Sequence, residues 1–231
     1  MKKRILLFVI IFTLVLPTSA FAQTSQIDYI SDDTKGGVEL DFRNFSYIMN
    51  GVNEEDVVIE KTVEKPEAIE YQIYNKDETK TIDTVRVDFD MTNPLADGAR
   101  AANTTSTYFS KYKTFKDGTK SVVELEYTVR VDLYSSGSFR AFYGADSSNL
   151  LIASAITSIE LVNVKTGVKS STGSYPTDSL SINYSCNLRT TGNVSTSIGA
   201  NLMGAGFNVT TGSNVYYYKT VKETGTIKLY N

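Results

Sequence analysis

Two pairs of carboxylates stand at a spacing that suits acid–base chemistry. Glu124 and Glu126 share one face of an alternating segment, as do Asp88 and Asp90. Residues two apart on a strand lie about 7 Å apart, and glycoside hydrolysis needs two carboxyl groups about 5 to 10 Å apart. The spacing therefore allows a carboxylate-dependent glycoside hydrolase. We favour the simpler explanation, because the polar face of an amphipathic strand carries charges where it meets water.

Other acidic groups raise calcium as an alternative ligand. Three acidic groups are rich in the oxygen ligands that Ca²⁺ takes. They are Asp32 and Asp33, the run Glu54–Asp56, and the Asp88/Asp90 pair. None of them matches an EF-hand loop, so we assign no metal ligand and expect no cofactor. The chain contains no His, which excludes Ser-His-Asp catalysis, Cys-His catalysis and the usual His-containing zinc sites.

The single Cys has a structural explanation. Cys186 alternates with Ile182, Tyr184 and Leu188 on one apolar strand face, where a thiol behaves as a small buried hydrophobe. One Cys cannot form an internal disulfide. A reactive thiol or an intermolecular disulfide is the alternative, but no basic neighbour on that face would lower the thiol pKa.

Tyrosine provides the candidate binding surface. The chain has 15 Tyr residues, and Tyr216, Tyr217 and Tyr218 stand in a row. Such rings stack on sugars or pack against a partner protein. The alternative is that Tyr216 and Tyr218 lie in the core.

The segment 192–211 is uncharged and alternates between apolar and small polar residues. It predicts a β-hairpin that turns near Gly204–Gly206, with Val194, Ile198 and Leu202 on its apolar face. Hairpins of this kind insert into bilayers in barrel-forming toxins, so a membrane-active protein is an alternative function. An ordinary sandwich hairpin is the explanation that we favour.

The N-terminus predicts a cleavable signal peptide over residues 1–22. A basic stretch at 2–4 precedes an apolar run at 5–16, and small residues lead to a cleavage site between Ala22 and Gln23. No other long apolar stretch and no lipid-acceptor Cys follow it. We therefore expect a secreted, extracellular protein of bacterial type without a stable membrane anchor after cleavage.

Removal of that peptide makes the chain more acidic. The signal peptide holds three of the 23 basic residues, so the mature chain has 20 basic against 26 acidic residues, a formal charge of −6. This balance argues against nucleic acid as a partner, and against simple electrostatic binding to anionic membranes.

Alternation with period two predicts strands through most of the chain. The clearest run is Val123–Leu133, with further runs at 85–90, 158–164 and 216–230. Turns are expected where Gly interrupts the pattern, at 116–119, 135–137, 165–167 and 223–225. Many short strands with frequent turns predict an all-β fold, namely an antiparallel β-sandwich or jelly-roll-like domain.

Domain organisation and function remain broader expectations. We predict a single β-sandwich domain over 23–231, with two small β domains at 23–95 and 103–231 as the alternative. The favoured function is a secreted, non-enzymatic β protein that binds a cell-surface, matrix or carbohydrate partner. The sequence gives no indication of the oligomeric state.

Overall fold

The computed structural model describes residues 37–76, 81–89, 103–136, 138–191, 193–210 and 215–230. The predicted signal peptide, its cleavage site at Ala22 and Gln23, and Asp32, Asp33 and Asp90 lie outside these residues. So does most of the expected boundary between the two alternative domains.

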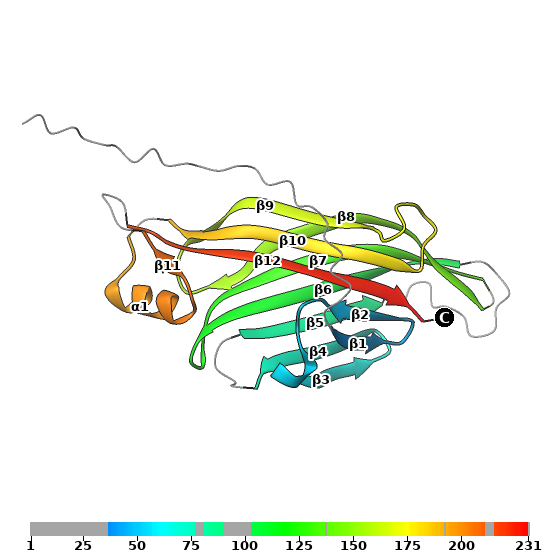
Figure 1. Ribbon diagram of the computed structural model, residues 1–231, viewed down its shortest axis with the longest axis horizontal. Helices are drawn as coiled ribbons and strands as arrows, with labels where there is room; N and C mark the ends of the chain where they lie inside the picture. The colour runs from blue at the N-terminus through cyan, green and yellow to red at the C-terminus, as the bar shows by residue number, and fades with distance from the viewer. Residues whose placement is uncertain are drawn as a thin grey trace, which may run out of the picture. The chain divides into compact units, whose positions relative to one another are not determined.

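The described chain is almost entirely β-strand (Figure 1). Its N-terminal elements are β1 (Val38–Phe42), β2 (Phe45–Met49), the short 3₁₀ helix η1 (Glu54–Asp56), β3 (Val57–Lys65), β4 (Ala68–Asn75) and β5 (Thr81–Phe89). The central elements are β6 (Asn103–Asp117), β7 (Lys120–Ser136), β8 (Phe139–Ala155), β9 (Ile159–Ser170) and β10 (Ser179–Thr190). The C-terminal elements are α1 (Thr196–Gly204), β11 (Asn208–Val209) and β12 (Tyr217–Leu229).

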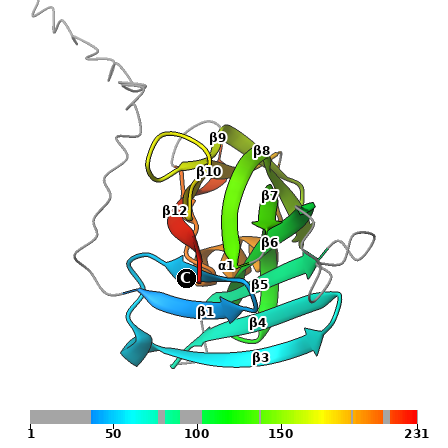
Figure 2. The same cartoon turned by 90° about the vertical axis from the view of Figure 1, so that its right-hand side faces the viewer.

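These strands form two antiparallel six-stranded sheets. Sheet A has the order β1-β2-β12-β10-β9, with β11 paired to β12. Sheet B has the order β3-β4-β5-β6-β7-β8, so each strand pairs with its neighbour in sequence. Figure 2 shows β10 and β12 of sheet A lying across from β6 and β7 of sheet B. The prediction of an all-β, sandwich-like fold is confirmed.

The alternation read from the sequence explains how β7 is buried. From Val123 to Leu133 every odd residue is buried and every even residue is half-buried, as predicted for a strand with one face on a core. Val85 and Val87 of β5 are buried in the same way. The predicted turn before β7 is also present. Asp117 pairs with Lys120, and Gly118 has a φ of 56°, which suits the first central position of a type II′ turn.

Aromatic rings from the two sheets meet in one core. Tyr47 of β2 lies 4.8 Å from Phe109 of β6, and Tyr184 of β10 lies 4.9 Å from Tyr127 of β7, between ring centroids. The Tyr127 hydroxyl also donates a 3.0 Å hydrogen bond to the carbonyl of Gly167 in β9. Buried rings therefore fix how the inner faces of the two sheets pack.

Two predicted turns are wrong. Residues 165–167 lie inside β9, and residues 223–225 lie inside β12. A Cβ added to Gly225 would lie 2.4 Å from Cε2 of the fully buried Tyr47 ring. Glycine stands in this strand because a neighbouring ring passes close to the backbone, and not because the chain turns there.

The predicted hairpin at 192–211 is also wrong. Its first half contains the helix α1, drawn in orange in Figure 1. Ser195 caps this helix by accepting a hydrogen bond from the backbone N–H of Ile198, and a Ser cap of this kind favours a helix start. The membrane-active interpretation was based on two strands here, and the structure has a helix in place of the first of them. In the described part of the chain, no helix has the length and apolar character needed to cross a membrane.

Candidate functional site

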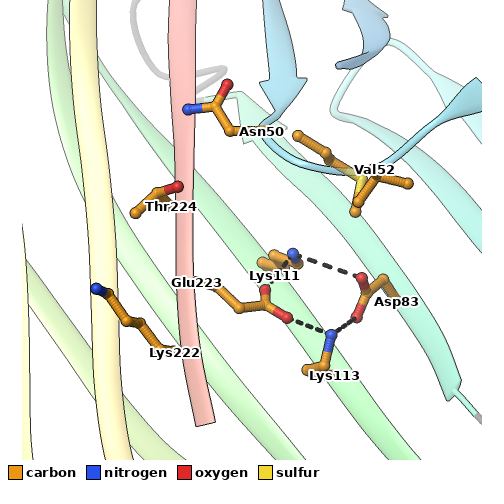
Figure 3. Close-up of a pocket in the computed structure, with 9 residues that line it drawn as sticks. Asn50, Val52, Asp83, Lys111, Lys113, Lys222, Glu223 and Thr224 are labelled. Atoms are coloured by element: carbon orange, nitrogen blue, oxygen red, sulfur yellow. Dashed lines mark hydrogen bonds and ion pairs between the residues drawn. The ribbon is translucent and has the colours of Figure 1, made fainter. Parts of the chain in front are cut away.

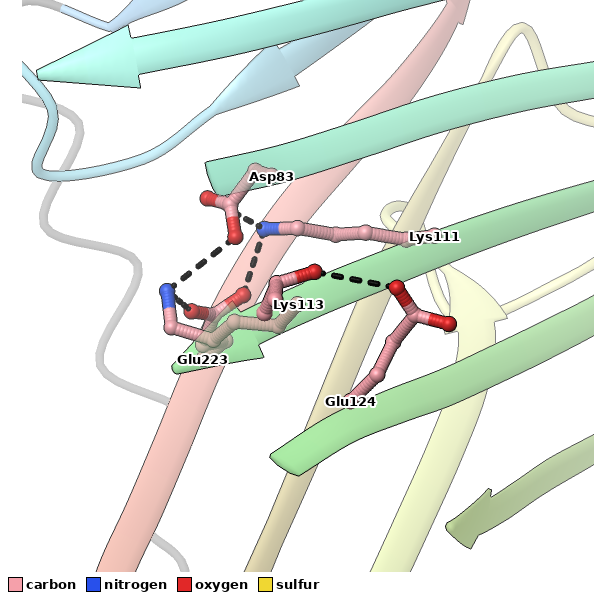
Figure 4. Close-up of polar contacts among 6 residues, drawn as sticks. Asp83, Lys111, Lys113, Glu124 and Glu223 are labelled. Carbon is pink, nitrogen blue, oxygen red and sulfur yellow. Dashed lines mark hydrogen bonds and ion pairs between the residues drawn. The ribbon is translucent and has the colours of Figure 1, made fainter. Parts of the chain in front are cut away.

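The most deeply buried charges form a closed ion network between the sheets (Figures 3 and 4). Lys111 Nζ lies 3.5 Å from Asp83 Oδ2, and Lys113 Nζ lies 3.3 Å from Asp83 Oδ1. Both ammonium groups also pair with the carboxylate of Glu223. Two cations thus share two anions, and we call these four residues the inter-sheet ion network.

Strand parity places the inter-sheet ion network in the interior. Lys111 and Lys113 continue the inward row of β6 that holds the buried Phe109 and Phe115. Asp83 sits opposite Lys113 in the β5–β6 register. Glu223 comes from β12 of the other sheet, so the network joins sheet A to sheet B.

A pocket of about 260 Å³ opens beside this network (Figure 3). The segment after β2 contributes Asn50 and Val52 to its lining, and β12 contributes Lys222 and Thr224. The four residues of the network also line the pocket, and their charges already have partners.

The electrostatics of the network hold Glu223, Lys111 and Lys113 in their charged forms. Burial acts to raise the pKa of Glu223, but Lys111 and Lys113 outweigh it and lower that pKa to about 2. Burial acts to lower the pKa of Lys111, but Asp83 and Glu223 outweigh it and raise that pKa well above the ordinary value. A carboxylate that stays ionised and ammonium groups that stay protonated cannot exchange protons near neutral pH. The arrangement therefore joins the two sheets, and its lysines and Glu223 are not suited to acid–base catalysis.

These four residues were not predicted from the sequence, although a signal is present there. Lys111 and Lys113 occupy the same parity as the aromatic residues Phe109 and Phe115. A charge at an inward position of a strand requires a buried partner. The sequence does not show on which other strand that partner lies.

Glu124 and Glu126, the predicted pair on β7, lie on the outer face of sheet B. Glu124 Oε2 accepts a 3.1 Å hydrogen bond from Thr114 Oγ1 (Figure 4). Glu126 Oε1 accepts hydrogen bonds from Tyr112 at 3.3 Å and from Thr128 at 3.2 Å. These contacts run across neighbouring strands and fit the explanation of a solvated strand face.

Within the described residues, Asp88 has a basic partner and the acidic run of η1 lies exposed. Asp88 pairs with Arg86 on its own strand, at 2.8 Å. Glu54, Glu55 and Asp56 lie exposed in η1. Among the described residues, no group of three or more acidic or Cys side chains is placed to hold a metal ion.

Cys186 lies where the alternation placed it. Its side chain is buried in the core with Ile182, Tyr184 and Leu188. Burial raises the pKa of its thiol to about 11, so the thiolate that a nucleophile needs is scarce at neutral pH.

The three consecutive tyrosines divide between the core and the surface. Tyr217 packs against the core cluster, whereas Tyr218 is exposed and Tyr216 half-buried. The rings of Tyr216 and Tyr218 lie 6.3 Å apart, and the guanidinium of Arg189 lies 5.6 Å from the Tyr216 ring. The alternative that Tyr216 and Tyr218 fill the core is therefore wrong.

A second aromatic group, not selected from the sequence, lies at the β7–β8 hairpin. The ring of Tyr134 lies 4.9 Å from Tyr143 and 6.2 Å from Phe139, between centroids. Phe139 is 54% exposed and Tyr143 52% exposed. Tyr134 pairs with the buried Ala141, and the other two rings come from positions on either side of that residue. We call these three rings the hairpin aromatic cluster.

Polar side chains adjoin the hairpin aromatic cluster on the outer face of sheet B. Ser106 donates a 2.7 Å hydrogen bond to Asp132 and accepts one of 2.9 Å from Arg130. Asp132 precedes Tyr134 by two residues on β7, so its carboxylate shares the face of the rings. Exposed rings beside hydrogen-bonding groups are suited to a ligand with both apolar and hydroxyl surfaces.

Comparison with models of known protein families gave no match, and neither curated proteins nor solved structures gave a match to this chain.

Proposed function

We propose that the mature chain is a secreted, non-catalytic protein that binds a carbohydrate of a cell surface or matrix through the hairpin aromatic cluster. The export part of this proposal rests on the signal peptide expected over residues 1–22. The binding part rests on one observation, the solvent exposure of Phe139 and Tyr143 beside Tyr134.

Exposed aromatic rings on a paired strand are better explained by binding of such a ligand than by a contribution to the stability of the protein alone. Two rings with more than half of their surface in water leave apolar area that a ligand can cover. Both come from the paired strand β8, so binding orders few groups that were free before. The apolar face of a sugar ring covers an aromatic ring, and its hydroxyl groups can bond to Asp132 and Arg130.

Binding of neutral polysaccharides to the mature chain tests the proposal. Phe139→Ala and Tyr143→Ala should each weaken binding about tenfold or more, because each removes an aromatic ring that contacts the sugar. Tyr218→Ala is the matched control, since Tyr218 is 38% exposed on β12 of sheet A. Failure of a broad glycan array to give any ligand would overturn the proposal, as would equal affinities of Phe139→Ala and Tyr218→Ala.

A further inference from the structure

The outer face of sheet A carries a concentration of lysines. Lys165 and Lys169 of β9 and Lys222 and Lys228 of β12 all point outward, because their cross-strand partners are the outward serines of β10. Ser185 of β10 has two cross-strand partners, Lys165 on β9 and Lys222 on β12. We call the outward side chains of β9, β10 and β12 the basic face.

Acidic residues are nearly absent from the basic face. On these three strands, Glu160 is the one outward carboxylate, and its Oε1 accepts a 2.6 Å hydrogen bond from Nε of Arg189. Glu223 of β12 points inward to the ion network. Among the described outward residues of these three strands, basic side chains therefore outnumber carboxylates, although the predicted mature chain has a net charge of −6.

Hydroxyl and amide groups fill the rows between the lysines. They belong to outward residues of β10 and β12, namely Ser179, Ser181, Asn183, Ser185, Asn187, Thr220, Thr224 and Thr226. Each can donate or accept a hydrogen bond. The basic face thus combines positive charge with hydrogen-bonding groups along two neighbouring strands.

An unpaired donor lies in the middle of this array. Asn183 is 7% exposed, and within the described chain its Nδ2 has no hydrogen-bond partner. Its cross-strand partners are Gly167, which has no side chain, and Thr224. A buried donor without an acceptor costs free energy, and an anionic oxygen bound beside Gly167 would satisfy it.

We propose that the basic face binds an acidic polysaccharide, with one of its anionic groups bonded to Asn183 Nδ2 between Lys165 and Lys222. The lysines supply charge-assisted hydrogen bonds to sulfate, phosphate or carboxylate groups. The serine and threonine hydroxyls bond to the sugar hydroxyls. This second surface is separate from the hairpin aromatic cluster and does not depend on the function proposed for that cluster.

The chemistry of the basic face favours a polysaccharide over two other polyanions. Proteins that bind single-stranded nucleic acid stack bases on aromatic rings. The positions between these lysines hold Ser, Thr, Asn and Gly, and the exposed ring of Tyr218 lies four residues before Lys222, beyond the lysine array. Peripheral membrane binding uses apolar side chains that enter the bilayer, and the same positions offer none. A polymer with hydroxyl and anionic groups matches the groups present.

Binding of dextran sulfate, with neutral dextran as the matched ligand, tests this proposal. The full mature chain should bind dextran sulfate and not dextran, and should bind more weakly at about 200 mM than at about 50 mM salt. Lys222→Glu/Lys228→Glu should weaken binding at least about tenfold, since it reverses two charges in the contact. Lys76→Glu/Lys120→Glu changes the net charge equally on exposed residues elsewhere, and should leave the affinity within about twofold.

Asn183→Asp provides a second test that keeps the shape of the side chain. It replaces the amide donor with a carboxylate, so it should also weaken binding about tenfold or more. A thermal melt of each variant checks that it folds, and the lysine variant remains informative if Asn183→Asp unfolds. Equal affinities of the Lys222/Lys228 and Lys76/Lys120 variants would overturn the proposal. Tighter binding to single-stranded DNA or anionic vesicles than to dextran sulfate would also overturn it.

Discussion

The inter-sheet ion network and the basic face both use lysines on central strands, yet they differ in every other respect. Lys111 and Lys113 lie inward, and each contacts two carboxylates. Lys222 is exposed on the outer side of β12, one residue before the inward Glu223. Adjacent residues of one strand therefore serve opposite purposes. Strand parity, and not residue type, decides whether a charge joins the sheets or faces a ligand.

Removal of one buried lysine should produce the largest effect. Lys111→Met leaves Asp83 and Glu223 with a single cation, and loss of one member of a buried ion pair costs about 3 to 5 kcal/mol. Urea denaturation followed by circular dichroism measures the change in the free energy of unfolding. Lys222→Met is the matched control and should stay within about 0.5 kcal/mol of the original chain. Equal losses in the two variants would remove the distinction between the two regions.

Acid should weaken the interior before it affects the basic face. The pKa of Glu223 in the folded chain is about 2, below its ordinary value of 4.5. A depressed carboxyl pKa contributes stability that is present above pH 4.5 and is lost as the pH falls toward 2. We expect the free energy of unfolding to fall across this window. Glu223→Gln should flatten the fall, and an unchanged slope in that variant would contradict the role of Glu223.

The outer carboxylates of sheet B should show the smallest effect. Thr114→Val removes the hydroxyl that bonds to Glu124 but keeps the shape of the side chain. The expected loss is about 1 kcal/mol or less, because the carboxylate can bond to water instead. Chemical denaturation measures it. A loss as large as that of Lys111→Met would show that Glu124 belongs to a network as important as the interior one.

Much of the fold was predictable because alternation reports burial directly. The burial of β7, the position of Cys186 and the turn at Gly118 all follow from period-two patterns and turn chemistry. The same pattern was wrong for α1, since a run of small and apolar residues also suits a short helix once Ser195 caps it. Gly225 was read as a turn because the approach of the Tyr47 ring depends on a distant strand.

The candidate sites were less predictable, since they depend on contacts between strands far apart in sequence. Lys111 and Glu223 are 112 residues apart, and no local pattern pairs them. The negative net charge gave no indication of the basic face, because net charge sums over surfaces of opposite sign. Outward acidic residues of sheet B, such as Glu124, Glu126 and Asp132, contribute to the negative net charge. Net charge alone therefore does not exclude an anionic partner.

A paired measurement of unfolding free energy and dextran sulfate affinity tests the central claim most directly. Lys111→Met should lower the free energy of unfolding and, while folded, keep its affinity within about twofold of the original chain. Lys222→Glu/Lys228→Glu should keep its stability within about 1 kcal/mol and lose at least about tenfold in affinity. The account would be contradicted if the Lys222/Lys228 variant kept its affinity, or if folded Lys111→Met lost as much affinity as that variant.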